Sequence, residues 1–400
     1  MARQREGSVG EVFRVALLLG LTSFGGPIAH LGYFRREYVE RRRWLSDATY
    51  ADLVALSQFL PGPASSQVGI GVGLLRAGYG GAVAAWLAFT LPSAVLLTAF
   101  AFLAAGADVA DSGWIHGLKL AAVAIVATAV LSMWRNLAPD LPRGLLALVA
   151  AAVILAIHSP FAQLAVIAGG GLIGWAFLRV PAPVEIDESP SPVGRRTAGM
   201  ALALFIGLLA GLPIAAAVTG LTGLAVVESF YRAGSLVFGG GHVVLPLLNE
   251  AVVGPGWVDP DQFLAGYGAA QAIPGPLFTF AAFLGASLRP EPNGLAGAAI
   301  AVGAIFLPSF LLVIGVFPFW HRLRASPTFR NALAGTNAAV VGLLLAALYD
   351  PVATSAVTSL VDVALVVAAL GVLILRDAPP WLVVAALAAA AQLTAAAGVG

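Results

Sequence analysis

Two pairs of glycine- and proline-rich motifs are the residues of this chain best suited to form a binding site. The first pair is Phe24-Gly25-Gly26-Pro27 and Phe238-Gly239-Gly240-Gly241. Both motifs interrupt apolar stretches, where glycine permits unusual backbone angles and proline ends a helix. An interrupted helix exposes N–H groups at the positive end of its dipole, and this arrangement suits an anion. The pair therefore predicts an anion site, with a plain hinge or close helix packing as the alternative.

The second pair of motifs shares the pattern Gln-x-x-Pro-Gly-Pro. Its members are Gln58 with Pro61-Gly62-Pro63 and Gln271 with Pro274-Gly275-Pro276. Each proline frees a carbonyl group one turn earlier, and each glutamine lies close enough along the chain to bond to that carbonyl or to a ligand. We expect Gln58 and Gln271 to contact a substrate, with purely structural capping of the break as the alternative.

Titratable and charged residues follow the glycine motifs. His30 and His242 lie within six residues of them, and an imidazole there could bind an anion or relay a proton. A structural histidine at a helix end is the alternative. Arg35 and Arg36 begin a basic run that fixes topology and could also form an electropositive cytoplasmic vestibule. The apolar windows hold no metal motif and no series of carboxylates, so we predict neither a catalytic residue nor a metal or other cofactor.

The composition places these motifs in a membrane. Of 400 residues, 60% are apolar and 10% are charged, whereas an ordinary soluble domain has roughly 25% charged residues. A bilayer-spanning helix needs ~20 apolar residues, and dividing the chain at its polar breaks gives about 12–13 such spans. This composition excludes a nucleic-acid binder with a basic face, and the net charge of +1 gives no electrostatic signal for any partner. The predicted fold is all-α and polytopic, with broken helices.

Internal repetition predicts the domain organisation. Besides the motif pairs, Leu91-Pro92-Ser93 recurs as Leu307-Pro308-Ser309 at nearly the same offset, which indicates a duplication. The loop after the first glycine motif is basic, and its counterpart at 243–261 is acidic. The positive-inside bias places the two loops on opposite sides of the membrane, as in inverted repeats. The arginines of 321–330 oppose this assignment, because a count of simple passes puts them outside.

Domain boundaries follow from the repeats and the polar breaks. We predict a first repeat domain at 1–178, a hydrophilic proline-rich linker at 179–197, and a second repeat domain at 198–400 that begins with one linking span. Basic residues flank both ends of 12–33. A re-entrant hairpin that turns at Gly25-Gly26-Pro27 explains this segment better than a single pass.

The combination of motifs resembles the chromate ion transporter (CHR) family in its long, two-domain form. The resemblance rests on both motif pairs and on His30, Gly32-Tyr33-Phe34, Trp44-Leu45, His242, Leu245-Pro246-Leu247-Leu248 and Gly256-Trp257-Val258. It implies a multi-pass transporter of the bacterial inner membrane that exports chromate from the cytoplasm and confers chromate resistance. The membrane potential, with or without proton coupling, would drive this export.

Three alternatives stay open at the level of sequence. Chromate and sulfate are both tetrahedral dianions, so a transporter of sulfate or of another oxyanion fits the motifs equally well. A membrane-embedded enzyme that holds phosphate is disfavoured, because no nucleophile, base or metal cluster accompanies the motifs. A non-transporting structural or sensory membrane subunit is disfavoured too, because both halves of the chain carry broken helices. The expected partners are the oxyanion and the lipid bilayer, with no nucleic acid, and a homodimer is left open.

Overall fold

The computed structural model describes residues 7–105, 112–157, 160–181, 191–239, 241–376 and 378–397. These residues form helices joined by turns, with no strand among them, which confirms the all-α prediction. The middle of the expected linker, 182–190, and Gly240 lie outside the described residues.

Within the described ranges, five helical segments are long and apolar enough to cross a bilayer. They are Ala64–Ala105, Gly113–Leu137, Arg195–Thr219, Gly294–Ala325 and Pro327–Ala356. Several other apolar helices are shorter because the glycine and proline motifs divide them. A helix of 13 residues, such as Asp47–Phe59, spans about 20 Å, which is less than the ~30 Å hydrocarbon core. The chain is a polytopic membrane protein in which full spans alternate with half-length helices.

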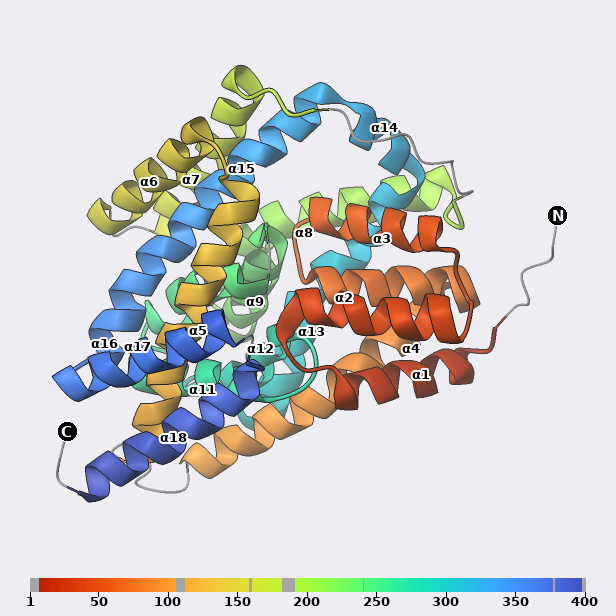
Figure 1. Ribbon diagram of the computed structural model, residues 1–400. Helices are drawn as coiled ribbons and strands as arrows, with labels where there is room; N and C mark the ends of the chain where they lie inside the picture. Colours follow the sequence, from red (N-terminus) through yellow and green to blue (C-terminus); the bar gives the residue numbers. More distant parts are fainter. Residues whose placement is uncertain are drawn as a thin grey trace.

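The first repeat begins with a helical hairpin. Helices α1 (Val9–Thr22) and α2 (Gly26–Phe34) meet at Gly25, whose φ of +96° suits a residue without a Cβ (Figure 1). Helix α2 runs back beside α1 and continues as a π-helix, Arg35–Arg41. Glu11 and Arg42 consequently line the same surface pocket. The segment 12–33 is therefore a re-entrant hairpin, as its flanking charges predict.

A second hairpin follows in the first repeat. Helix α3 (Asp47–Phe59) is joined to the first arm of α4 (Ala64–Ala105) through Pro61-Gly62-Pro63. Helix α4 then folds back at Gly78, whose φ is +62°. Both hairpins have their tips in the middle of the molecule and their bases at one face (Figure 1). We call it the arginine face, because it carries Arg35, Arg36, Arg41, Arg42 and Arg76.

The second repeat has the same order of elements. Its hairpins are made by α9 (Thr222–Leu236) with the short helices Gly241–Val243, α10 (Val244–Leu248) and Asn249–Val253, and by α11 (Pro260–Ala272) with Leu277–Thr279, α12 (Phe280–Ser287) and α13 (Gly294–Val316). Their bases are joined where the Arg289 N–H donates to the Trp257 carbonyl at 2.9 Å. The face that holds these bases is here called the opposite face.

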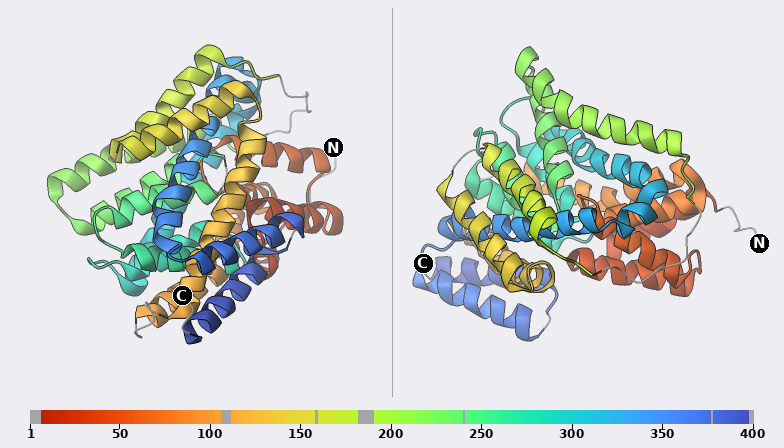
Figure 2. Two further views of the ribbon diagram at one scale, coloured as in Figure 1. Left: turned by 60° about the vertical axis from the view of Figure 1, so that its left-hand side comes forward. Right: turned by 90° about the horizontal axis from the view of Figure 1, so that it is seen from above.

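The remaining helices are exchanged between the repeats. Helices α6 (Leu141–Ala156) and α7 (Pro160–Phe177) of the first repeat pack on α15 (Pro327–Ala347) of the second (Figure 2). In return, α17 (Leu360–Leu375) and α18 (Pro380–Ala396) pack on α5 (Gly113–Leu137) of the first repeat. Helix α8 (Arg195–Thr219) precedes the second repeat and packs on α9 and α13. Each repeat therefore completes the other.

The equivalent helices α5 and α15 run in opposite directions. Leu137, at the end of α5, and Asn337, in α15, both lie against Gly239. At the other end of α5, His116 bonds to Asp362, which lies beyond the end of α15. Figure 1 shows the two helices crossing in antiparallel directions. This is the relation that inverted repeats require.

The hairpins also correct the expected position of the arginines in 321–330. Arg324 donates to Asp52 of α3 at 2.9 Å, and Phe59 stacks on Phe329. The segment therefore lies beside α3, on the side of the arginine face. The count of simple passes was wrong because each hairpin returns to the face from which it started. With that correction, the arginines of both segments lie on one side, in agreement with the positive-inside bias.

Candidate functional site

The hairpin tips of the two repeats are bonded to each other at the centre of the molecule. The Gly62 N–H donates to the Val237 carbonyl at 2.7 Å, and the Gly275 N–H donates to the Ser23 carbonyl at 3.0 Å. These are equivalent bonds, since each Pro-Gly-Pro element of one repeat contacts the glycine break of the other. A Cβ added to Gly241 would lie 3.4 Å from Pro27. The structure thus brings both pairs of motifs together.

Glycine is required in both Pro-Gly-Pro elements. Gly62 and Gly275 have φ values of +125° and +109°, which residues with a Cβ rarely adopt. A Cβ would also lie 2.9 Å from Ser309 Oγ in the first case and 2.7 Å from Ser93 Oγ in the second. The repeated Leu-Pro-Ser motifs therefore supply the small residue that lets the tip of the other repeat approach.

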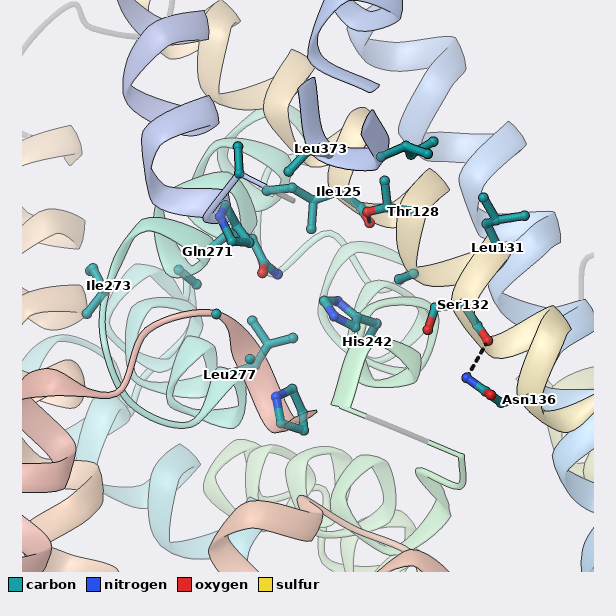
Figure 3. A pocket seen from close by; sticks show the side chains of 18 of the residues that line it. Ile125, Thr128, Leu131, Ser132, Asn136, His242, Gln271, Ile273, Leu277 and Leu373 are labelled. Atoms are coloured by element: carbon teal, nitrogen blue, oxygen red, sulfur yellow. Dashed lines mark hydrogen bonds between the residues drawn. The ribbon is translucent and has the colours of Figure 1, made fainter. Parts of the chain in front are cut away.

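A cavity of about 580 Å³ opens beside these tips. Its walls combine the first glycine break, the second Pro-Gly-Pro element, the polar side of α5 and the ends of α17 and α18. The polar and backbone groups that line it come from Gly25, Gly26, Thr128, Ser132, Arg135, Asn136, His242, Gln271 and Gly275. Figure 3 shows the Gln271 amide and the His242 ring facing the same space from opposite walls. Since Arg135 lies near the end of α5, the cavity opens towards the arginine face.

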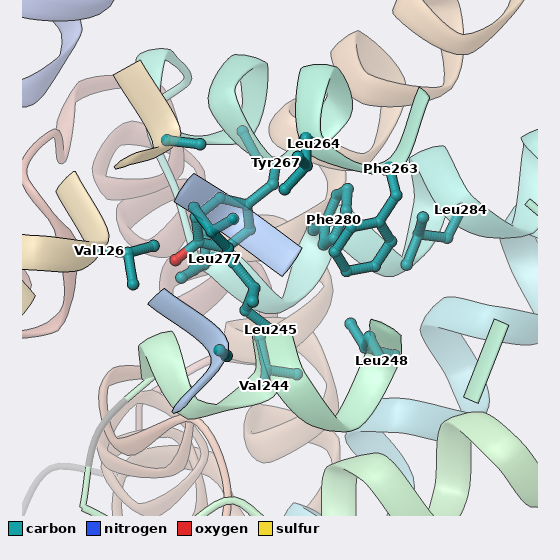
Figure 4. Packing of buried hydrophobic residues seen from close by; sticks show 14 of the residues in the cluster. Val126, Val244, Leu245, Leu248, Phe263, Leu264, Tyr267, Leu277, Phe280 and Leu284 are labelled. Carbon is teal, nitrogen blue, oxygen red and sulfur yellow. The ribbon is translucent and has the colours of Figure 1, made fainter. Parts of the chain in front are cut away.

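The cavity wall offers hydrogen-bond donors and one cation. The buried Gln271 amide nitrogen has no hydrogen-bond partner among the described residues. His242 Nδ1 lies 3.0 Å from the hydroxyl of Tyr267, which is fully buried in the core behind the site (Figure 4). Arg135 is exposed to the cavity and makes no ion pair within the described part of the chain. None of the described lining residues is Asp or Glu.

Buried hydroxyl groups without partners surround the tips. Within the described residues, the Oγ atoms of Ser23, Ser66 and Ser309 are buried and unpaired. A buried polar group without a partner costs about 1–3 kcal/mol. Such groups are retained where water or a ligand pairs with them at some stage of function. These three hydroxyl groups lie at or beside the tips, where a bound water or ligand could pair with them.

Several predicted site residues frame the centre without lining the cavity. Gln58 is exposed and lies away from it, and Gln67 instead donates from Nε2 to the Pro61 carbonyl at 2.7 Å. His30 is buried, with Nε2 at 3.2 Å from the Ser23 carbonyl and Nδ1 at 3.3 Å from Ser65 Oγ. Two further sets lie outside the lining: the prolines Pro61, Pro63, Pro274 and Pro276, and the second-break residues Phe238, Gly239 and Gly241.

Two other predicted residues lie near the edges of the site. Phe24 packs against Trp381, at the start of α18, with ring centroids 6.1 Å apart. Pro27 lines the cavity beside Gly26.

The predicted vestibule residues lie at the hairpin bases instead. Arg35 bonds to Asp47 at 2.7 Å and also to Glu40, and its pKa is raised by the hydrogen bond and charge of Asp47. Arg36 faces a separate surface pocket that Glu37 also lines. Burial alone would raise the pKa of Glu37, but hydrogen bonds from Arg42 and Arg41 outweigh it and hold the pKa below its ordinary value. These arginines are partly neutralised at a distance from the tips.

The polar side of α5 was not predicted from the sequence. Thr128, Ser132 and Asn136 recur at a spacing of four residues, which places them on one face of a helix. That periodicity is a signal that could have identified this wall. It is weak, because isolated Ser and Thr residues are common in membrane helices, where they bond to the preceding turn. Thr128 does so here, donating to the Ile125 carbonyl at 2.8 Å.

The other end of α5 is closed. Lys119 Nζ donates to Asp261 of α11 at 3.0 Å. Gly117 and Gly268 lie in direct contact with the backbones of α18 and α5, where a Cβ would overlap neighbouring atoms. Helices α5, α11 and α18 therefore seal the site towards the opposite face while it stays open towards the arginine face.

Known proteins resemble this chain along most of its length. The family model described as "Chromate transporter" matches residues 10–175 and 224–393. A probable chromate transport protein of Synechococcus elongatus is 29% identical over 344 residues, which cover 85% of this chain and 84% of the relative. A chromate transport protein of Pseudomonas aeruginosa is 30% identical over 353 residues, which cover 86% and 81%. No solved structure matches the chain. The chain is thus a multi-pass membrane transporter rather than an enzyme, and it belongs to the chromate transporter family.

Proposed function

We propose that this protein is a secondary transporter that exports a tetrahedral oxyanion, most specifically chromate, from the cytoplasm across the inner membrane. The cavity at the hairpin tips would hold the anion. The names of the relatives support chromate as the substrate. The proposed direction rests on the opening of the cavity towards the arginine face, which the positive-inside bias assigns to the cytoplasm.

One observation carries the proposal. Where both repeats are interrupted, the cavity is lined by glycine backbone, by the unpaired Gln271 amide and by the unpaired cation Arg135. None of its described lining residues is a carboxylate. A dianion that leaves water must regain several hydrogen bonds and some opposite charge. The composition of this wall meets that need and would repel no anion. A volume of about 580 Å³ also exceeds the ~30 Å³ share of one water molecule many times, so a hydrated ion can enter.

The membrane potential is the proposed energy source. Moving one charge across 100 mV is worth about 2.3 kcal/mol, so a dianion that leaves a negative-inside cell gains about 4.6 kcal/mol at that potential. Export can therefore proceed without proton coupling. Among the described residues of the cavity wall, the titratable side chains are His242 and Arg135. Any proton coupling is therefore proposed to act through His242.

Flux measurements with two matched glutamine variants test the proposal. The purified protein is reconstituted into the membrane of proteoliposomes, and the uptake of labelled chromate or labelled sulfate is measured. The membrane potential and the pH gradient are imposed separately. We expect potential-driven chromate flux, strongly reduced by Gln271→Ala and retained by Gln58→Ala, because Gln271 alone of the two lines the cavity. Greater competition by sulfate than by chromate itself would favour sulfate as the substrate. Equal flux in both variants and the unchanged protein would refute the proposed site.

A further inference from the structure

A second, smaller pocket lies on the side of the opposite face. Its volume is about 260 Å³, and it is enclosed by the ends of α6, α7 and α15 and by the first hairpin of the second repeat. Its lining residues include Ile154, Leu155, Pro246, Asn249, Glu250, Leu343, Ala347 and Asp350. This pocket is separate from the proposed anion site.

The second pocket uses the same positions of the duplicated fold as the central cavity. On α5, the cavity is lined by Ala129, Ser132 and Arg135, and after an offset of 214 or 215 residues the pocket is lined by Leu343, Ala347 and Asp350. The ends of the neighbouring helices correspond too, since Leu373 and Ile374 line the cavity where Ile154 and Leu155 line the pocket. Because the repeats are inverted, these equivalent walls face opposite sides of the membrane.

The two spaces differ in how deep they reach. The central cavity touches the tips, at Gly25 and Gly275. Among its described lining residues, the second pocket includes no tip residue, and it ends instead at Pro246 and Asn249. Gln163 of α7 donates to the Pro246 carbonyl at 3.3 Å across the pocket. One route from the tips is therefore open, and its equivalent is closed.

The two spaces also differ in charge. Asp350 stands in the pocket at the position that Arg135 occupies in the cavity, and Glu250 adds a second carboxylate. Asp350 is exposed, and the Thr354 hydroxyl donates to it at 3.3 Å. Both carboxylates would repel a dianion that approaches the tips from this side.

We propose that the second pocket is the exit vestibule, the closed equivalent of the central cavity. In the alternate state, α6, α7 and α15 part around the tips as α17, α18 and α5 do here, and the site opens to the opposite face. The carboxylates of Asp350 and Glu250 lower the affinity for an anion at that face, so a released dianion rebinds poorly. The inference rests on the proposed function and adds a route and an asymmetry to it.

Thiol accessibility tests the route. The chain has no cysteine, so single cysteines can be introduced by Ser132→Cys and Ala347→Cys, at equivalent positions of the two spaces. A membrane-impermeant thiol reagent is applied to everted vesicles and to spheroplasts. We expect Ser132→Cys to react only from the arginine face and Ala347→Cys only from the opposite face. Chromate should change the two labelling rates in opposite directions. Gly194→Cys, at the exposed start of α8 where an added Cβ meets no atom within 4 Å, is the control whose labelling stays unchanged by chromate. Labelling of both positions from the same face would overturn the route.

Affinity measured from each face tests the asymmetry. Half-saturating chromate concentrations are compared at the two faces of oriented proteoliposomes for Asp350→Asn, Glu250→Gln and the control Glu291→Gln, which removes another exposed acid of the opposite face. Each pocket variant should lower the half-saturating chromate concentration at the opposite face about fourfold relative to the concentration at the arginine face. This is the effect of removing one negative charge ~10 Å from a dianion in water. An unchanged ratio in both variants would overturn the role of the carboxylates. Normal thiol labelling without flux of any oxyanion would instead refute the proposed function alone.

Discussion

At the scale of single residues, the site depends on glycines, which have no side chain, as much as on polar side chains. Gly62 and Gly275 donate the backbone hydrogen bonds to Val237 and Ser23 that join the two repeats. Their positive φ values are rarely adopted by other residues, and a Cβ would overlap neighbouring atoms. Of the serine hydroxyls beside them, Ser309 Oγ has no partner among the described residues, whereas Ser93 Oγ donates to the Thr90 carbonyl at 3.0 Å. Glycine backbone at Gly25, Gly26 and Gly275 therefore lines the cavity together with Gln271 and Arg135.

Gly275→Ala should destabilise the protein and abolish flux. The change introduces a left-handed alanine, which costs about 1–2 kcal/mol, and an overlap with Ser93 Oγ at 2.7 Å, for which overpacking costs of about 1–3 kcal/mol are typical. Thermal unfolding in detergent measures the loss. Gly207→Ala, in a helix with no atom within 4 Å of the added Cβ, serves as the control. Equal stability of both variants would contradict the strain at the tip.

Arg135→Gln should weaken anion binding from the arginine face. A dianion ~5 Å from one charge gains enough Coulomb energy in water for an effect of about tenfold on the half-saturating concentration. The salt dependence of that concentration should fall with the charge. Arg143→Gln removes an arginine near the same end of α5 that is already paired with Asp140 at 2.6 Å, and should leave transport unchanged. Equal effects of the two substitutions would argue against a role of Arg135 in the cavity.

At the scale of elements, the hairpin is the unit that positions the site. Each half-length helix ends at a glycine or proline near the middle of the membrane, and its partner returns to the same face. Freed backbone groups are tolerated there because they bond to the tip of the other repeat or border the cavity. At the bases, charged networks such as Glu37 with Arg41 and Arg42 hold the returning helices.

The base of the first hairpin should lose stability in acid. The pKa of Glu37 is lower in the folded protein than its ordinary value of 4.5, so its stabilising contribution is complete above that pH and disappears as the pH falls through the folded pKa. Thermal unfolding between pH 6 and pH 3.5 should therefore show a decline that Glu37→Gln reduces. An identical pH profile for the variant would show that other groups cause the decline.

At the scale of the whole molecule, the two repeats are completed by each other. The helices α6 and α7 pack on α15, and α17 and α18 pack on α5. The crossed bonds at the tips add a second level of exchange. A repeat by itself would expose these helix faces and leave its break without partners. In the proposed mechanism, the inverted arrangement also supplies two equivalent routes to one site, as alternating access needs.

Chains divided within 182–190 should reassemble only when both are present. We expect residues 1–181 and 191–400, produced separately, to aggregate or to be degraded, because each lacks the helices that cover α5 or α15. Produced together, they should co-purify and transport chromate. Affinity purification with a tag on one half, followed by flux assay, measures this. A stable, monodisperse first half alone would contradict the exchanged packing.

The membrane location, the helical class, the duplication and the positions of all four breaks were predictable from the sequence. Hydrophobic runs, glycine and proline act on the backbone next to them, so neighbouring residues are enough to reveal each of these properties. The recurrence of Leu-Pro-Ser was also visible, but its role was not, because Ser93 and Ser309 act on the repeat to which they do not belong.

Which polar residues share a cavity depends on contacts between distant parts of the chain. Gln58 and Gln271 occupy equivalent positions in the sequence, yet Gln271 lines the open cavity and Gln58 is exposed elsewhere. The reason is that the surroundings of each glutamine are set by the helices packed around it, such as α5 and the ends of α17 and α18 beside Gln271. The side of the membrane on which 321–330 lies was likewise fixed by the returning hairpins. Such properties depend on contacts between residues some two hundred positions apart, which no local pattern encodes.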